Sequence, residues 1–155
     1  MGIHWKKLLF SLALPLGVGA LASALAGSYD LYGGLIQPPL SRPGWVFPVV
    51  WTALYLLMGY ASYRVWAADA EQSTKSRALA LYGLQLAANF VWPLLFFGGQ
   101  WYLLAFLWLA GLWVLILLTM RAFDIVDETA SNLLIPYLLW ATFALYLNFG
   151  VWLLN

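Results

Sequence analysis

Long stretches without a charged residue dominate this chain and restrict what it can fold into. They run from Leu8 to Ser28, Pro43 to Tyr63, Ala78 to Met120 and Thr129 to Asn155. A helix needs roughly 20 apolar residues to cross the hydrocarbon core of a bilayer, and the third stretch is about twice that length. Its middle holds Gly98-Gly99-Gln100, a sequence that predicts a turn between two helices.

We therefore predict an all-α membrane protein: a bundle of five transmembrane helices in one domain that covers residues 1–155. The expected spans are about residues 6–27, 44–66, 77–97, 101–122 and 130–153. The composition agrees, because 65% of the residues are hydrophobic and only 8% are charged, against about 25% charged in soluble domains. A soluble domain this short could not bury so much apolar surface, so a lipid bilayer is the expected partner.

Several chemistries are excluded by what the sequence lacks. The net charge is +1, which argues against a nucleic-acid partner. There is no cysteine, and the single histidine is His4, so thiolate catalysis, cysteine-ligated metals and histidine chemistry inside the membrane are excluded. The charged residues lie only near the ends of the predicted spans and leave the interior of each span uncharged, which argues against ion pumps and proton relays. We expect no metal site and no required cofactor.

The basic residues predict the orientation. The N-terminus, the second loop and the fourth loop share one side, which carries Lys6, Lys7, Arg64, Lys75, Arg77 and Arg121. The other side carries only Arg42. By the positive-inside rule, the N-terminus is cytoplasmic. A cleaved signal peptide ending at Ala24-Leu25-Ala26 is the alternative for the first span, but its apolar run exceeds the usual length, so we favour a retained helix.

The first loop, from Gly27 to Arg42, is the longest connection and contains Pro38 and Pro39. Prolines restrict the backbone and lower the entropy cost of ordering a loop. Such a loop is either a surface connector or a stiff lid over a pocket, and the sequence alone leaves both open.

Three predicted spans each carry a stripe of aromatic and amide side chains at helical spacing. The stripes consist of Phe47, Trp51 and Tyr55 in the second span, Gln85, Asn89, Trp92 and Phe96 in the third, and Tyr137, Trp140, Ala144 and Asn148 with the neighbouring Phe143 in the fifth. An amide without a partner in hydrocarbon costs several kcal/mol, so these faces point inward. They predict either core packing or a pocket for a large, flat, apolar ligand.

The fourth span and the outer face of the third span have simpler patterns. The fourth span is rich in Leu and Trp from Leu103 to Leu118 and is expected to be a lipid-facing scaffold. Gly83 and Ala87 in the third span form a small-xxx-small pair away from its polar face. Such pairs let helices approach closely, which makes a homodimer through the third helix a hypothesis.

Three segments of the sequence together resemble the translocator protein family (TspO/MBR, the peripheral-type benzodiazepine receptors). The resemblance rests on the segment from Pro43 to Tyr55, the segment from Gln85 to Gly98, and the segment from Leu134 to Asn148, which occur in the family's order. It implies a five-helix bundle with a pocket closed by the first loop. It places pocket residues at Tyr32, Trp51, Tyr55, Asn89, Trp92, Trp140, Phe143 and Ala144.

The resemblance also implies a function: a receptor or binding protein for porphyrins such as protoporphyrin IX and related planar ligands, in a bacterial inner membrane. The alternatives are a light-dependent porphyrin-degrading enzyme, with Trp51 and Trp140 as the candidate catalytic indoles, and a transporter of porphyrin or sterol. The chain departs from the family's first-loop pattern at Leu40 and Arg42, although Arg42 suits a propionate carboxylate.

Overall fold

The computed structural model describes residues 4–26 and 46–155, and within these it describes no side chain for Ala26, Val46 or Phe47. The proline-rich loop that was predicted as a lid, together with Tyr32, lies outside the described residues. The same holds for the side chain of Phe47.

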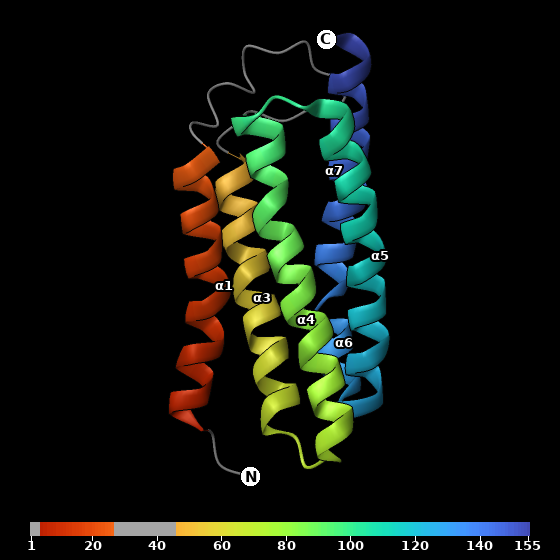
Figure 1. Cartoon of the computed structure of the whole chain (residues 1–155). Coiled ribbons are helices and arrows are strands. Elements are labelled where there is room, and N and C mark those ends of the chain that lie inside the picture. The colour runs from red at the N-terminus through yellow and green to blue at the C-terminus, as the bar shows by residue number, and fades with distance from the viewer. Residues whose placement is uncertain (1–3, 27–45) are drawn as a thin grey trace.

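The described part of the chain is helical and contains no strand, as predicted for an all-α fold. Its elements are α1 (Trp5–Ala26), α3 (Val46–Ala67), α4 (Gln72–Pro93), the π-helix η1 (Leu94–Gly98), α5 (Tyr102–Val126), α6 (Glu128–Asn132) and α7 (Ile135–Leu154). The long helices run side by side, with α1 at one edge of the bundle and α5 with α7 at the other (Figure 1).

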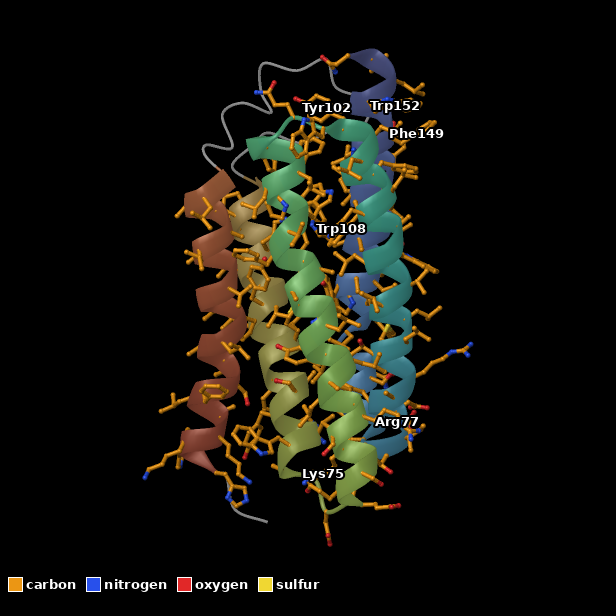
Figure 2. The ribbon with its side chains drawn as sticks, in the orientation of Figure 1. Lys75, Arg77, Tyr102, Trp108, Phe149 and Trp152 are labelled. Carbon is orange, nitrogen blue, oxygen red and sulfur yellow. The ribbon has the colours of Figure 1, made fainter. Side chains whose placement is uncertain are left out.

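Within residues 4–26 and 46–155, four segments are long and apolar enough to cross a membrane: Trp5–Leu25, Gln72–Gly98, Tyr102–Val126 and Glu128–Leu154. Helix α3, which corresponds to the second predicted span (residues 44–66), is not among them: it has 22 residues but carries hydroxyl groups and Arg64 along its second half. Apolar helices of this length make the chain an integral membrane protein. Lys75 and Arg77 lie at one end of the bundle, and Tyr102, Phe149 and Trp152 lie at the other (Figure 2).

The third and fourth predicted spans meet at the expected turn, which has an unusual local structure. Pro93 lacks an N–H and is the last residue of α4, and the chain continues as the π-helix η1. The N–H of Gly99 donates to the carbonyl of Leu94 at 2.8 Å, and Gln100 then adopts a left-handed φ of 56°. The predicted turn at Gly98-Gly99-Gln100 is confirmed, whereas the π-helix before it was not predicted.

Two helix boundaries differ from the prediction. Helix α4 begins at Gln72 rather than near residue 77, because its first turns are polar and hydropathy locates the apolar span, not the helix start. The last predicted span is divided into α6 and α7. Asp127 caps α6 by accepting from the N–H of Thr129 at 3.0 Å, and its other carboxylate oxygen accepts from Nε of Arg64 at 2.8 Å.

The fourth predicted span, α5, is the scaffold of one half of the bundle. It packs against both α4 and α7. Its buried residues recur at helical spacing and form one stripe: Ala105, Leu109, Leu112, Ile116, Thr119 and Phe123. The opposite side, including Leu104, Leu107 and Leu118, is exposed and faces the lipid.

Helix α1 approaches α3 closely because two glycines remove side-chain bulk. A Cβ atom on Gly59 would lie 2.6 Å from the carbonyl oxygen of Ser11 and 3.0 Å from the Cα of Leu12. A Cβ atom on Gly19 would overlap the ring of Tyr55. The α1–α3 interface therefore depends on glycine at these points.

We expect Gly59→Ala to lower the free energy of unfolding by about 1–3 kcal/mol, because the backbones of α1 and α3 must separate. The matched control is Gly17→Ala in α1, where an added Cβ meets nothing within 4 Å and alanine gains up to about 1 kcal/mol in helix propensity. Thermal unfolding of both variants in the same detergent measures the difference. Equal midpoints for the two variants would contradict the close contact.

Candidate ligand-binding site

A buried chain of hydrogen bonds joins three helices at the centre of the bundle. The hydroxyl of Tyr55 in α3 donates to Oδ1 of Asn89 in α4 at 2.9 Å. Nδ2 of Asn89 donates to the hydroxyl of Tyr137 in α7 at 2.7 Å, and that hydroxyl donates to Oε1 of Gln85 at 2.8 Å. Nε2 of Gln85 donates to the carbonyl of Tyr82 at 2.9 Å. The amides therefore find their partners inside the bundle, as hydrocarbon requires.

A second polar contact lies toward the η1 end of α4. Nε1 of Trp92 donates to Oδ1 of Asn148 at 3.0 Å, and Nδ2 of Asn148 donates to the carbonyl of Tyr102 at 2.8 Å. Trp92 and Asn148 are 4% and 1% exposed, so α4, α5 and α7 are joined by groups that water does not reach.

Trp51 is the point where the aromatic stripes meet. Its ring stacks on Tyr55 with centroids 5.7 Å apart and lies 6.4 Å from the ring of Trp92. The rings of Tyr137 and Trp140 approach it edge-on at 6.2 Å and 6.5 Å. The predicted inward faces of α3, α4 and α7 thus converge on one indole.

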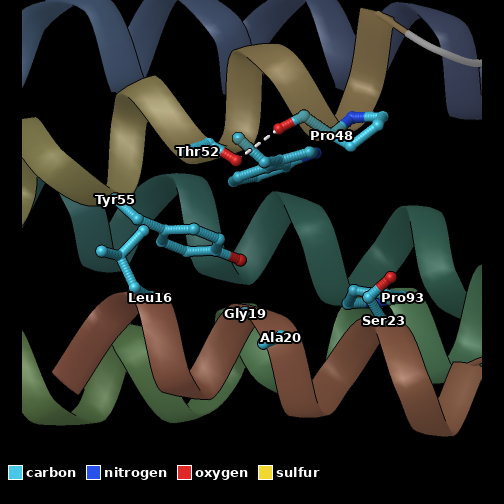
Figure 3. A pocket seen from close by; sticks show the side chains of 9 residues that line it. Leu16, Gly19, Ala20, Ser23, Pro48, Thr52, Tyr55 and Pro93 are labelled. Carbon is cyan, nitrogen blue, oxygen red and sulfur yellow. Dashed lines mark hydrogen bonds between the residues drawn. The ribbon is translucent and has the colours of Figure 1, made fainter. Parts of the chain in front are cut away.

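A cavity of about 320 Å³ lies on the α1 side of Trp51 and Tyr55 (Figure 3). Helix α3 contributes Pro48, Trp51, Thr52 and Tyr55, helix α1 contributes Leu16, Gly19, Ala20 and Ser23, and α4 contributes Pro93. Trp51 and Tyr55 are the predicted site residues that line it. Among the described residues, the cavity wall holds no charged side chain, and no cluster of His, Asp or Glu could hold a metal.

The other predicted site residues lie behind the cavity wall or outside the part of the chain that the structure describes. Seven are buried in the packed core, where they contact one another: Gln85, Asn89, Trp92, Phe96, Tyr137, Ala144 and Asn148. Trp140 and Phe143 are half-buried on α7, with ring centroids 5.5 Å apart. Tyr32 and the side chain of Phe47 are not described.

The sequence analysis missed the contribution of α1 to the cavity. Gly19 and Ser23 are small residues four positions apart in the first span, a spacing that is typical of helix packing. The same residues leave space beside Trp51, and Ser23 adds a hydroxyl to the wall. Small residues at helical spacing were the available signal, but they do not distinguish a packed face from a hollow one.

The wall can stack on a flat ligand and offer it hydroxyl groups. The indole of Trp51 and the phenol of Tyr55 present aromatic surface to the cavity, and Tyr55 is oriented by Asn89. The hydroxyl of Thr52 already donates to the carbonyl of Pro48 at 2.7 Å. Because the described residues of the wall carry no charge, they favour ligands whose buried part is apolar.

These features define a class: a small integral membrane protein whose helices enclose an apolar cavity with an aromatic wall. Residues 11–153 match the TspO/MBR family. The chain belongs to the TspO/MBR family, and the resemblance found in the sequence is confirmed.

Relatives of similar length support this assignment. The chain is 39% identical to the tryptophan-rich sensory protein of Cereibacter sphaeroides over 155 residues, which cover 100% of this chain and 95% of that protein. It is 38% identical to the tryptophan-rich protein TspO of Chlorobaculum tepidum over 157 residues, which cover 97% and 99%. The translocator protein of Homo sapiens is 40% identical over 125 residues, which cover 78% of this chain and 72% of that protein.

We expect Tyr137→Phe to lower the free energy of unfolding by about 1–3 kcal/mol, because Asn89 and Gln85 each lose a buried partner while the ring remains. Tyr60→Phe is the matched control, since the Tyr60 hydroxyl is exposed and accepts only a 3.4 Å hydrogen bond from Arg64. Unfolding in detergent micelles compares the two variants. A Tyr137→Phe variant as stable as Tyr60→Phe would show that the hydrogen-bond chain does not stabilise the bundle.

Proposed function

We propose that this chain is a membrane receptor or binding protein for porphyrins of the protoporphyrin IX type and related flat apolar ligands. The observation that supports this most directly is the uncharged cavity beside Trp51 and Tyr55, whose rings suit a planar ligand. Membership of the TspO/MBR family agrees with it, and one relative bears the name of a sensory protein. A role in tetrapyrrole or stress signalling is part of this proposal.

The size of the cavity indicates how a tetrapyrrole is accommodated. About 320 Å³ is at the lower end of the range for drug-sized ligands, and a whole porphyrin is larger, so the cavity must widen. Helix α1 is the wall best able to move, because the bundle buries little of it. In the most apolar 18-residue part of each segment, 17% is buried in α1, against 44% in the α4–η1 segment. We propose that α1 moves away from α3 as the ring enters beside Trp51.

The proposed ligand-binding set retains every residue predicted from the sequence. Trp51 and Tyr55 contact the ligand first, and the others form the inner site after the cavity widens: Tyr32, Phe47, Gln85, Asn89, Trp92, Phe96, Tyr137, Trp140, Phe143, Ala144 and Asn148. The first loop as a lid over this site is part of the proposal and rests on the sequence alone.

A second candidate function is light-dependent porphyrin degradation, because Trp51 lies next to both Trp92 and Trp140. Indoles around a bound photosensitiser are the side chains that light-driven oxidation would reach first. Product spectra after illumination, compared with those of free porphyrin, separate degradation from binding. Transport of porphyrin or sterol is the third alternative, and ligand flux into proteoliposomes would reveal it.

We expect Ala20→Phe to weaken protoporphyrin IX binding at least tenfold, because the added ring fills the cavity beside Trp51. The measurement is quenching of tryptophan fluorescence in purified protein as protoporphyrin IX is added. Ala53→Phe is the control: Ala53 is also exposed, but it lies on α3 outside the cavity wall. Equal affinities for the two variants would place the ligand elsewhere.

We further propose that α3 is the fifth span and that the N-terminus is cytoplasmic in a bacterial inner membrane. The ribbon supports five spans, because α1, α3, α4, α5 and α7 each run along the bundle (Figure 1). The basic residues Lys75 and Arg77 and the start of α1 lie at the same end of it (Figures 1 and 2).

Since the chain has no cysteine, single cysteines report this topology without background. We expect Gln72→Cys to stay unlabelled by a membrane-impermeant maleimide added outside intact cells, and Asn155→Cys to be labelled. Permeabilised cells, in which both should react, are the control. Labelling of both positions from outside would contradict an odd number of membrane crossings between Gln72 and Asn155.

The homodimer predicted through Gly83 and Ala87 stays a prediction. Both residues are exposed on α4, and a Cβ atom on Gly83 would meet nothing within 4 Å. The described chain therefore leaves this face open to an occupant.

A further inference from the structure

A second cavity lies near the end of the bundle where α1 begins, away from the site beside Trp51. It is a groove of about 250 Å³ between α1, α3 and α4. Its lining consists of Phe10, Ser11, Leu14, Ser62, Trp66, Leu79, Tyr82 and Gly83. None of these residues belongs to the proposed porphyrin site.

The groove has a cation at its outer end. Nζ of Lys7 lies 5.2 Å from the ring centroid of Trp66, and Phe10 packs edge-on against the same indole at 6.1 Å. The contact with Trp66 fixes the ammonium group beside the groove. None of the described residues that line the groove is acidic, so these residues do not neutralise the charge of Lys7.

Hydroxyl groups follow one helical turn deeper. Lys7, Ser11 and Leu14 lie on one face of α1 at spacings of four and three. Ser11 and Ser62 are each 5% exposed, and the hydroxyl of Ser62 donates to the carbonyl of Gly59 at 2.8 Å. The hydroxyl of Tyr82 lies near Ser62, but its geometry does not make a hydrogen bond to it or to any other described group.

Beyond the hydroxyls the groove is apolar and open. This part is formed by Leu14, Leu79 and Gly83. Because glycine has no side chain, Gly83 leaves the groove accessible from the lipid. The order of cation, hydroxyls and apolar surface along the groove matches the order of phosphate, glycerol esters and acyl chain in a phospholipid.

We propose that this groove binds an anionic phospholipid, with the phosphate beside Lys7, the ester region at Ser11 and Ser62, and one acyl chain between Leu14 and Gly83. Charge complementarity favours this occupant over a second copy of the chain. A twofold axis along the membrane normal would place the two Lys7 ammonium groups at the same depth across the interface, where they repel each other. An anionic lipid instead gains from the cation.

The test uses the full chain in detergent micelles and phospholipids with brominated acyl chains, which quench nearby indoles. The contribution of Trp66 is the difference between the wild type and Trp66→Phe. We expect phosphatidylglycerol to quench half of this contribution at a concentration about fivefold lower than phosphatidylcholine requires. This is the preference for an anionic lipid that one lysine near a membrane surface confers.

Two matched pairs of variants locate the lipid. Lys7→Gln should abolish the preference for phosphatidylglycerol, whereas Lys6→Gln, an exposed neighbour that does not contact Trp66, should retain it. Gly83→Leu should remove the quenching of Trp66 by filling the groove. Gly17→Leu, where an added Cβ likewise meets nothing within 4 Å, should not. Circular dichroism checks that the variants remain folded, and Leu79→Phe, which adds bulk to the same groove without adding an indole, replaces Gly83→Leu if that variant does not fold.

Three results would overturn the proposal. Equal quenching of Trp66 by phosphatidylglycerol and phosphatidylcholine would show that the groove does not select an anionic headgroup. Quenching that survives both groove-filling variants would place the lipid elsewhere. Absence of quenching in the wild type, with disulfide crosslinking of Gly83→Cys in the membrane, would assign the groove to a second copy of the chain.

Discussion

The bundle depends on the rule that polar groups inside a membrane must satisfy one another. Asn89 and Gln85 sit in the middle of α4, where an amide without a partner is costly. The hydroxyl of Tyr137 serves both amides and thereby joins α7 to α4, while Tyr55 joins α3 through Asn89. Apolar packing between helices gives little net preference over lipid, so these bonds and the close packing around Trp51 define how three helices fit together.

Helix α1 is held differently, and this difference produces both cavities. No hydrogen bond of the central chain reaches it, and its contact with α3 relies on close approach at Gly19 and Gly59. The two helices are in contact where a small residue of α1 faces a large side chain of α3, as Gly19 faces Tyr55. Where small residues of α1 face no side chain of α3, a cavity remains, as beside Trp51. A helix that no buried side-chain hydrogen bond of the central chain holds in place is the element that we propose moves at the lowest cost.

The sequence predicted the helical class and the inward faces because hydropathy and helical spacing report directly on lipid contact. It placed the turn after Gly98 for a similar reason, since glycine interrupts an apolar run. It did not predict the break between α6 and α7, because the residues Leu133 and Leu134 look equally apolar in a continuous helix. It also could not tell whether an inward face is filled or hollow, which depends on the partner helix. Asn89 and Tyr137 were therefore predicted as pocket residues, yet in the described structure they bind each other.

The two cavities share one wall, and this links the proposed sites. Leu16 to Ser23 of α1 line the cavity beside Trp51, while Phe10 to Leu14 line the groove. Gly59 of α3 lies against the backbone of α1 at Ser11 and Leu12, beside the groove, and against Pro15, which stands between the two segments. A lipid that fills one side and a porphyrin that widens the other both act on the position of the same helix. Any change that lipid binding makes in porphyrin affinity must be matched by an equal change in lipid affinity, because coupling between two equilibrium sites is reciprocal.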